Sequence, residues 1–322
     1  MFLNFFRFCA GVKERSPLRK FTAYLLITAP PLIWATALAG ALYGLEPFSS
    51  WLYFFAWWPY ILMLEGLLFL FQEKYWMFNR PRELLRLLGW SVTIWLVFEA
   101  FNLVLGNWRY AGMLPQWGLR WLGYALAFAT VLPGILLTAR VLAAWGAWKE
   151  AKGPVRGWAS WQPLFLILGA ACFILPLTLP RYAFPLVWGA FFFLLDPIND
   201  LLTGTSLTRR WLAGERRETY CLLAAGLTCG IWWEMWNSPA AAKWVYTLPV
   251  LNFGKIFEMP VLGYLGFLPF ALECAVMYNF YKVLEERVLV TPRRRRWFWL
   301  GQLAYWLAMF AAMDMWTVIF YQ

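Results

Sequence analysis

The residues best suited to chemistry lie in the segment Ile231–Asn237, which reads Ile-Trp-Trp-Glu-Met-Trp-Asn. Glu234 stands among three tryptophans near the end of an apolar stretch, and Asn237 follows one helical turn later on the same face. A carboxylic acid can donate a proton, and an aromatic ring can stabilise a cation over its face. The segment therefore predicts an acid site, or a binding site, in apolar surroundings.

The same pattern occurs earlier in the chain. Glu99 and Asn102 have the spacing of Glu234 and Asn237. Three further matches keep the same order: Trp108-x-Tyr110 with Trp244-x-Tyr246, residues 58–65 with 188–196, and Leu132–Thr138 with Leu268–Cys274. The matches lie about 131 to 136 residues apart, so one alignment carries all of them. They predict an internal duplication.

The composition predicts an all-α, polytopic membrane protein. Of the 322 residues, 62% are hydrophobic and 14% are charged, whereas a soluble domain has about 25% charged residues. A membrane-spanning helix needs about 20 mostly apolar residues. Nine stretches meet this need: 21–43, 52–71, 86–105, 121–145, 163–180, 183–203, 219–237, 258–282 and 297–320.

The basic residues predict the orientation of these helices. If the N-terminus is cytoplasmic, the inner loops hold all but five of the 28 lysines and arginines. The five exceptions are Arg109, Arg120, Arg181, Lys243 and Lys255. This bias follows the positive-inside rule. We expect a multi-pass protein of the cell inner membrane with its C-terminus outside, and the basic excess does not indicate nucleic-acid binding.

The repeat and the helices together predict four regions. Residues 1–20 form a cytoplasmic interfacial anchor, 21–157 the first four-helix unit, 158–290 the second unit, and 291–322 an extra helix. Because four crossings return the chain to the same side, the two units are parallel and related by an axis along the membrane normal. Gly226 and Gly230 form a GxxxG pair, as do Gly40 and Gly44, and both pairs predict close packing.

Several classes of site are excluded. The chain has no histidine, and its five cysteines form no CxxC pair, so a zinc site, a histidine-ligated haem and a Ser-His-Asp triad have no support. No glycine-rich phosphate-binding motif occurs. We expect no metal, no cofactor and no nucleotide.

Acidic residues in the apolar stretches are the main candidates for function. They are Glu65, Glu99, Asp196, Glu234, Glu258, Glu273 and Asp314. A carboxylate at the bilayer centre costs about 2.5–3.5 kcal/mol, and no lysine or arginine is expected inside the helices to offset it. These acids are therefore neutral, or accept hydrogen bonds from nearby Asn, Trp and Tyr side chains, and face the bundle interior.

We predict a site in the outer half of the bundle, and within its second unit. The candidate catalytic residues are Glu234, Glu273 and Glu99. The candidate substrate-binding residues are Trp233, Trp236, Asn237, Trp244, Tyr246, Asn102, Trp108, Tyr110, Glu258, Glu65 and Asp196.

The order of these residues resembles a known signature. Glu234, Trp244, Tyr246, Pro269 and Glu273 follow one another as in the repeated motif of membrane lycopene cyclases and related carotenoid hydratases. The first copy offers Glu99, Trp108, Tyr110 and Pro133 in the same order. The resemblance implies a multi-helix protein of tandem halves that protonates a polyene without metal or nucleotide, as an isomerase, cyclase or hydratase.

Three functions remain open on the sequence. The first is an enzyme or binding protein for a membrane lipid or isoprenoid. The second is a structural subunit that packs against other subunits of a membrane complex. The third is a proton- or cation-coupled transporter that uses Glu65, Asp196, Glu99 and Glu234 as a buried relay.

Overall fold

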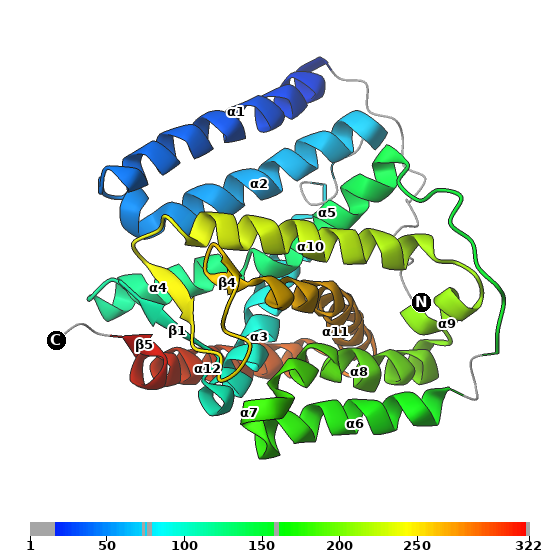
Figure 1. Ribbon diagram of the computed structural model, residues 1–322. Helices are drawn as coiled ribbons and strands as arrows, with labels where there is room; N and C mark the ends of the chain where they lie inside the picture. Colours follow the sequence, from blue (N-terminus) through cyan, green and yellow to red (C-terminus); the bar gives the residue numbers. More distant parts are fainter. Residues whose placement is uncertain (1–16, 73–74, 76–78, 158–160, 320–322) are drawn as a thin grey trace.

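The computed structural model describes residues 17–72, 75, 79–157 and 161–319. Most of the predicted anchor at 1–20 lies outside these residues. The long helices run side by side in a bundle, with α1 and α2 along one edge and α6 and α8 along the opposite edge (Figure 1).

The helices account for the apolar stretches of the sequence. They are α1 (Pro17–Leu42), α2 (Phe48–Gln72), α3 (Pro81–Leu105), α4 (Trp117–Phe128), α5 (Val131–Trp145), α6 (Gln162–Thr178), α7 (Pro180–Ala183), α8 (Val187–Thr203), α9 (Leu207–Leu212), α10 (Arg217–Asn237), α11 (Phe267–Arg287) and α12 (Pro292–Trp316), with 3₁₀ turns η1 (Phe184–Leu186) and η2 (Val261–Gly266). Among the described residues, six segments are long and apolar enough to cross a membrane. The prediction of a polytopic all-α membrane bundle is confirmed at this level.

Large apolar side chains on the outside of the bundle agree with a lipid environment. Leu32 is 70% exposed, Ile167 66% and Leu201 68%. Such side chains on α1, α6 and α8 would face water in a soluble protein, but hydrocarbon is a favourable solvent for them. The outward surface is therefore a lipid-facing surface.

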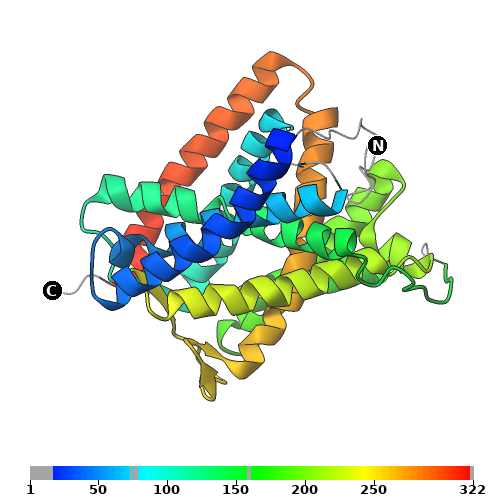
Figure 2. The same cartoon turned by 90° about the horizontal axis from the view of Figure 1, so that it is seen from above.

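A small β-sheet interrupts the helical pattern, and the sequence did not predict it. Strand β1 (Trp108–Ala111) lies between β2 (Lys243–Tyr246) and β5 (Val318–Ile319). β1 pairs with β2 antiparallel, and with β5 parallel. We call the end of the bundle that carries this sheet the sheet end. A second pair of strands, β3 (Lys255–Ile256) and β4 (Met259–Pro260), forms a hairpin that projects from the bundle (Figure 2).

The predicted helix at 121–145 is two helices. The chain breaks between α4 and α5, at residues 129–130. Ser91 on α3 bridges the break, because its hydroxyl donates to the Phe128 carbonyl at 2.5 Å and accepts from the Leu132 amide at 3.0 Å. Irregular backbone at membrane depth needs such partners. The side chain of a neighbouring helix therefore allows a break that the hydropathy of the stretch conceals.

Glycine packing agrees with one of the two predicted contacts. A methyl group added at Gly226 on α10 would lie 2.2 Å from the Phe267 carbonyl oxygen, and one at Gly230 would lie 2.2 Å from the Phe267 ring. These two glycines let α10 and α11 approach closely, as predicted. In the other pair only Gly40 is close-packed, against Phe48, whereas Gly44 has open space and a φ of +68°. Gly44 instead serves the turn between α1 and α2.

Candidate functional site

Glu99 is a buried carboxyl group held by aromatic donors. It lies on α3, fully buried, and its Oε1 accepts from the Trp95 indole at 2.9 Å and the Trp108 indole at 3.1 Å. The Tyr110 hydroxyl donates to the same oxygen. Trp108 and Tyr110 come from β1, so this carboxyl group ties the strand to α3.

Asn102 fixes the backbone of β1 on the same helix. Its side-chain amide donates to the Trp108 carbonyl at 2.9 Å, and its Oδ1 accepts from the Asn107 and Trp108 amides at 2.9 and 3.2 Å. Asn237 does the same for β2: it donates to the Trp244 carbonyl at 2.8 Å and accepts from the Trp244 amide at 3.0 Å. The side chains of the two asparagines thus hold the strand backbones in place by hydrogen bonds, and we call them asparagine clips. They do not line the cavity described below.

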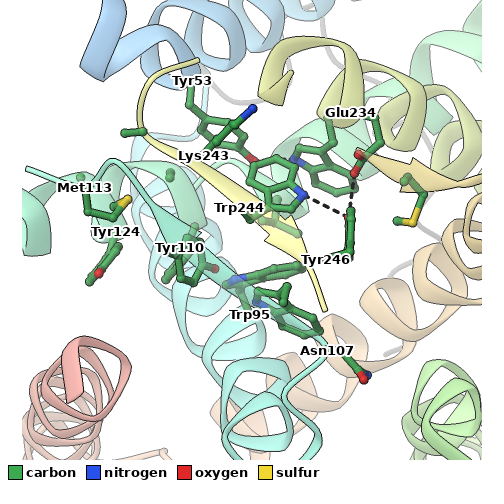
Figure 3. Close-up of a pocket in the computed structure, with 18 of the residues that line it drawn as sticks. Tyr53, Trp95, Asn107, Tyr110, Met113, Tyr124, Glu234, Lys243, Trp244 and Tyr246 are labelled. Atoms are coloured by element: carbon green, nitrogen blue, oxygen red, sulfur yellow. Dashed lines mark hydrogen bonds between the residues drawn. The ribbon is translucent and has the colours of Figure 1, made fainter. Parts of the chain in front are cut away.

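Glu234 on α10 has a sparser environment than Glu99. Its Oε1 accepts from the Tyr246 hydroxyl at 2.7 Å, and that hydroxyl accepts in turn from the Trp244 indole at 3.0 Å (Figure 3). Its Oε2 is buried and has no hydrogen-bond partner within the described part of the chain. Glu99 Oε2 and Glu273 Oε2 are likewise buried without a partner among the described residues, but neither residue lines the cavity described below. Glu234 is therefore distinguished by its position and not by the unpartnered oxygen itself.

An apolar cavity of about 210 Å³ opens beside Glu234 at the sheet end of the bundle. Aromatic side chains from the helices α2, α3, α4, α8, α10 and α11 and from the strands β1 and β2 form most of its wall (Figure 3). They include Tyr53, Phe54, Trp95, Trp108, Tyr110, Tyr124, Phe128, Trp188, Trp233, Trp244, Tyr246, Phe267 and Phe270. Glu234 is the acidic residue that lines this cavity, whereas Glu99 lies behind the rings of Trp95, Trp108 and Tyr110.

The ring geometry makes this wall continuous. Trp233 stacks on Phe267 with ring centroids 5.7 Å apart, and Trp188 stacks on Phe98 at 5.3 Å. Phe270 packs edge-on against Trp188 at 5.5 Å. Ring faces and edges are thus fixed by neighbouring rings, and a positive charge in the cavity would meet several ring faces.

Two cavity residues have a polar role that sequence reasoning missed. Tyr53 on α2 accepts a hydrogen bond from the Trp233 indole. Lys243 on β2 lines the cavity and donates to Glu258 at 2.8 Å, whereas the predicted binding residue Glu258 does not itself line the cavity. Tyr53 lies one turn before Trp57 in an apolar stretch, and no pattern of spacing in the sequence distinguishes it from its neighbours. Only the folded structure therefore shows that it lines the cavity.

The remaining candidates lie away from the cavity. Glu273 on α11 is buried and accepts from the Phe191 amide of α8 at 2.8 Å. Asp196 accepts from the Leu207 and Thr208 amides, both at 2.9 Å, and so holds the start of α9.

The other two candidates outside the cavity lie on α2 and α10. Glu65 is buried on α2, more than three turns from Tyr53. Trp236 packs in the core, with its ring centroid 5.0 Å from that of Trp57. The structure therefore gathers Glu234, Trp233, Trp244, Tyr246, Trp108 and Tyr110 around one space, and separates the rest.

One expectation about charge is wrong. No lysine or arginine was expected inside the helices, but Arg120 lies within α4 and is only 5% exposed. Its guanidinium group makes a bidentate ion pair with Asp314 of α12. The Arg120 Nε lies 2.7 Å from Asp314 Oδ1. Trp121 and Tyr124 also donate to this carboxylate, at 2.8 and 3.0 Å. Asp314 therefore fastens α12 to the first half of the chain.

The two strand tyrosines are fixed as hydrogen-bond donors. Burial, and then the neighbouring Glu234, raise the pKa of Tyr246 well above its ordinary value of 10.0. Burial and Glu99 do the same to the pKa of Tyr110. Both phenols stay protonated at neutral pH. No group of three or more potential metal ligands occurs among the described residues.

Comparison with known proteins gives no match to this chain. No protein-family model, no curated protein and no solved structure matches it.

Proposed function

We propose that the protein binds an apolar isoprenoid-like or lipid molecule in the cavity and protonates it with Glu234. The observation that carries this proposal is the unpartnered, buried Glu234 Oε2 in the wall of an aromatic cavity. A buried polar atom in an apolar cavity needs a hydrogen-bond partner or another acceptor for its proton. A carbon–carbon double bond in the cavity would be such an acceptor for the proton on Glu234 Oε2. The resemblance to lycopene cyclases and carotenoid hydratases supports the same chemistry.

The proposed step balances without a cofactor. The proton on Glu234 Oε2 passes to one carbon of a double bond, whose π electrons form the new C–H bond. The positive charge stays on the neighbouring carbon, facing the rings of Trp233, Phe267 and Trp244. An internal double bond then attacks this carbon, or a water adds to it, and the proton that is released returns to the Glu234 carboxylate. The Trp244–Tyr246–Glu234 hydrogen bonds stabilise the carboxylate in between.

The orientation and the repeat belong to this proposal. We place the sheet end outside, with Arg209, Arg210 and the run 293–296 on the cytoplasmic side. Two helix pairs support the duplication: α3 begins at Pro81 and α10 at Arg217, while α5 begins at Val131 and α11 at Phe267, a difference of 136 residues each time.

The pairing of the strands supports the duplication independently. Trp108 pairs with Tyr246, and Tyr110 pairs with Trp244. Corresponding residues thus exchange partners, as in a contact across a twofold axis.

The test combines pigment analysis with matched variants. The protein is expressed in a lycopene-accumulating bacterium, and the extracted pigments and the lipids that copurify with the protein are analysed by mass spectrometry. We expect a new product that Glu234→Gln abolishes and Glu273→Gln retains, because Glu273 is equally buried but outside the cavity. Unchanged pigment together with no copurified apolar molecule, in a folded protein, would refute the proposal.

A second candidate, proton-coupled transport, has one observation in its favour. Deeper in the bundle, Tyr60 and Thr138 share a hydrogen bond of 2.8 Å, and Thr138 lies 3.7 Å from the Cys229 thiol. This buried polar chain lies between the cavity and Glu65 on α2. Transport would be favoured if proteoliposomes with the protein take up protons and the double variant Tyr60→Phe with Thr138→Val does not. Proteoliposomes with the unsubstituted protein that take up no more protons than empty liposomes would exclude transport.

A further inference from the structure

A second hollow adjoins the cavity between the first turns of α2 and the end of α4. Its lining is wholly apolar: Pro47, Trp51, Phe54, Phe55 and Leu126. Three of these residues, Trp51, Phe54 and Leu126, also line the cavity beside Glu234. The hollow, which we call the α2–α4 groove, is therefore adjacent to the cavity, with these three side chains between the two spaces.

Local backbone geometry opens this groove. Trp51 leaves the helical conformation inside α2, with φ −115° and ψ 19°. On the other side α4 is short, and its residues Leu119 and Leu122 are 46% and 49% exposed on the outward surface. The groove thus lies between a distorted helix start and a helix that faces lipid.

The size of the cavity limits what it encloses. Its volume of about 210 Å³ is below the roughly 300–1,000 Å³ typical of sites that enclose a drug-sized ligand. A long isoprenoid or acyl chain must therefore extend beyond it. A hydrocarbon chain beside Asn107 or Lys243 would take water from their polar groups without replacing its hydrogen bonds. The α2–α4 groove is lined by apolar side chains, so a hydrocarbon chain there has no such cost.

We propose that the α2–α4 groove holds the chain of the ligand whose reacting double bond lies at Glu234, and that the ligand passes between α2 and α4 from the bilayer. This inference rests on the proposed function and narrows its substrate class to linear, membrane-dissolved molecules longer than the cavity. A compact ring compound or a short prenyl alcohol would leave the groove unused.

Two photoreactive probes test the inference on the unsubstituted protein in nanodiscs. Both are prenyl alcohols with a diazirine at the hydrocarbon end, one of geraniol length and one of geranylgeraniol length. After irradiation, peptide mass spectrometry locates the label. We expect the short probe to mark cavity residues such as Phe267, and the long probe to mark Phe55, which lines only the groove.

A matched pair of variants on α4 sharpens the result. Leu126→Trp fills the groove and should lower labelling of Phe55 by about tenfold. Leu122→Trp, one turn away and outside both hollows, should leave both labelling patterns unchanged. If both probes mark Phe267 and neither marks Phe55, the chain site is refuted while the proposed function stands. If neither probe marks the cavity or the groove, the proposed function itself fails.

Discussion

Glu99 and Glu234 occupy matching positions on α3 and α10, each one turn before an asparagine that clips a strand, but only Glu234 lines the cavity. Three aromatic donors surround Glu99 Oε1, whereas within the described part of the chain Tyr246 alone donates to Glu234. The same local pattern thus supplies a carboxyl group that holds a strand on α3 and one that lines the cavity on α10.

Leucine substitutions should separate these two roles. Glu99→Leu leaves three aromatic donors without an acceptor, and each buried donor that loses its acceptor costs about 1–3 kcal/mol. Glu234→Leu leaves one. We expect Glu99→Leu to lower the thermal midpoint in detergent clearly more than Glu234→Leu, which should instead abolish ligand binding. Equal losses of stability would contradict the assignment of a structural role to Glu99.

The two asparagine clips should be energetically coupled. Asn102→Ala and Asn237→Ala each remove hydrogen bonds to one strand, and β1 and β2 share a ladder. Residues within one network show coupling of about 0.5–3 kcal/mol in a double-mutant cycle. We expect the double variant to lose less stability than the two single losses predict, because the first substitution already loosens the sheet. Additive losses would show that the strands are held independently.

Loss of one partner of the ion pair between Arg120 and Asp314 should destabilise the protein more than loss of both partners. Removing one partner leaves a buried charge, at a cost of about 3–5 kcal/mol, whereas replacing both with apolar residues can be close to neutral. We therefore expect Asp314→Leu to be strongly destabilising and Arg120→Met with Asp314→Leu to recover much of the loss. Denaturation midpoints of the three proteins check this. If the double variant is no more stable than Asp314→Leu, the unpaired buried charge of Arg120 is not the cause of the destabilisation.

Alkaline pH should destabilise the protein partly through Tyr246. Its pKa in the folded protein is raised well above 10.0, by burial first and by Glu234 second, while an unfolded tyrosine ionises near 10. The stabilisation is therefore complete below pH about 10 and is lost as the pH rises toward the folded pKa. Stability measured between pH about 8 and about 11 should fall less steeply in Tyr246→Phe.

Close packing at Gly226 should be sensitive to one methyl group. The added carbon would meet the Phe267 carbonyl at 2.2 Å, so the α11 backbone must move, and such overpacking costs about 1–3 kcal/mol. Because Phe267 lines the cavity, Gly226→Ala should also weaken ligand binding. Gly301→Ala on α12, which meets nothing within 4 Å, is the control and should be neutral or stabilising. Equal effects of the two substitutions would exclude close packing as the cause.

The sequence predicts the membrane class and the helix positions well because both depend on local composition. Twenty apolar residues favour a helix in lipid whatever their neighbours are, and the structure has helices within every predicted stretch. Among the described residues, six segments are long and apolar enough to span a membrane, and the predicted spans 163–180, 219–237 and 297–320 are not among them. The spacing of Glu234 and Asn237 likewise determined that they share a helix face. Aromatic residues after each helix suggested a site near the helix ends, and the cavity lies there.

Tertiary structure decided which of these residues meet. The break between α4 and α5 depends on Ser91 from another helix, and the position of Asp314 depends on Arg120, 194 residues away. Glu273 follows the predicted motif, but its α11 position faces α8 and not the cavity. Helical periodicity fixes which residues share a face, but the packing of distant elements fixes what that face contacts. For that reason the sequence placed Glu234 first among the candidate acids, and only the fold separated it from Glu99 and Glu273 by the cavity that it lines.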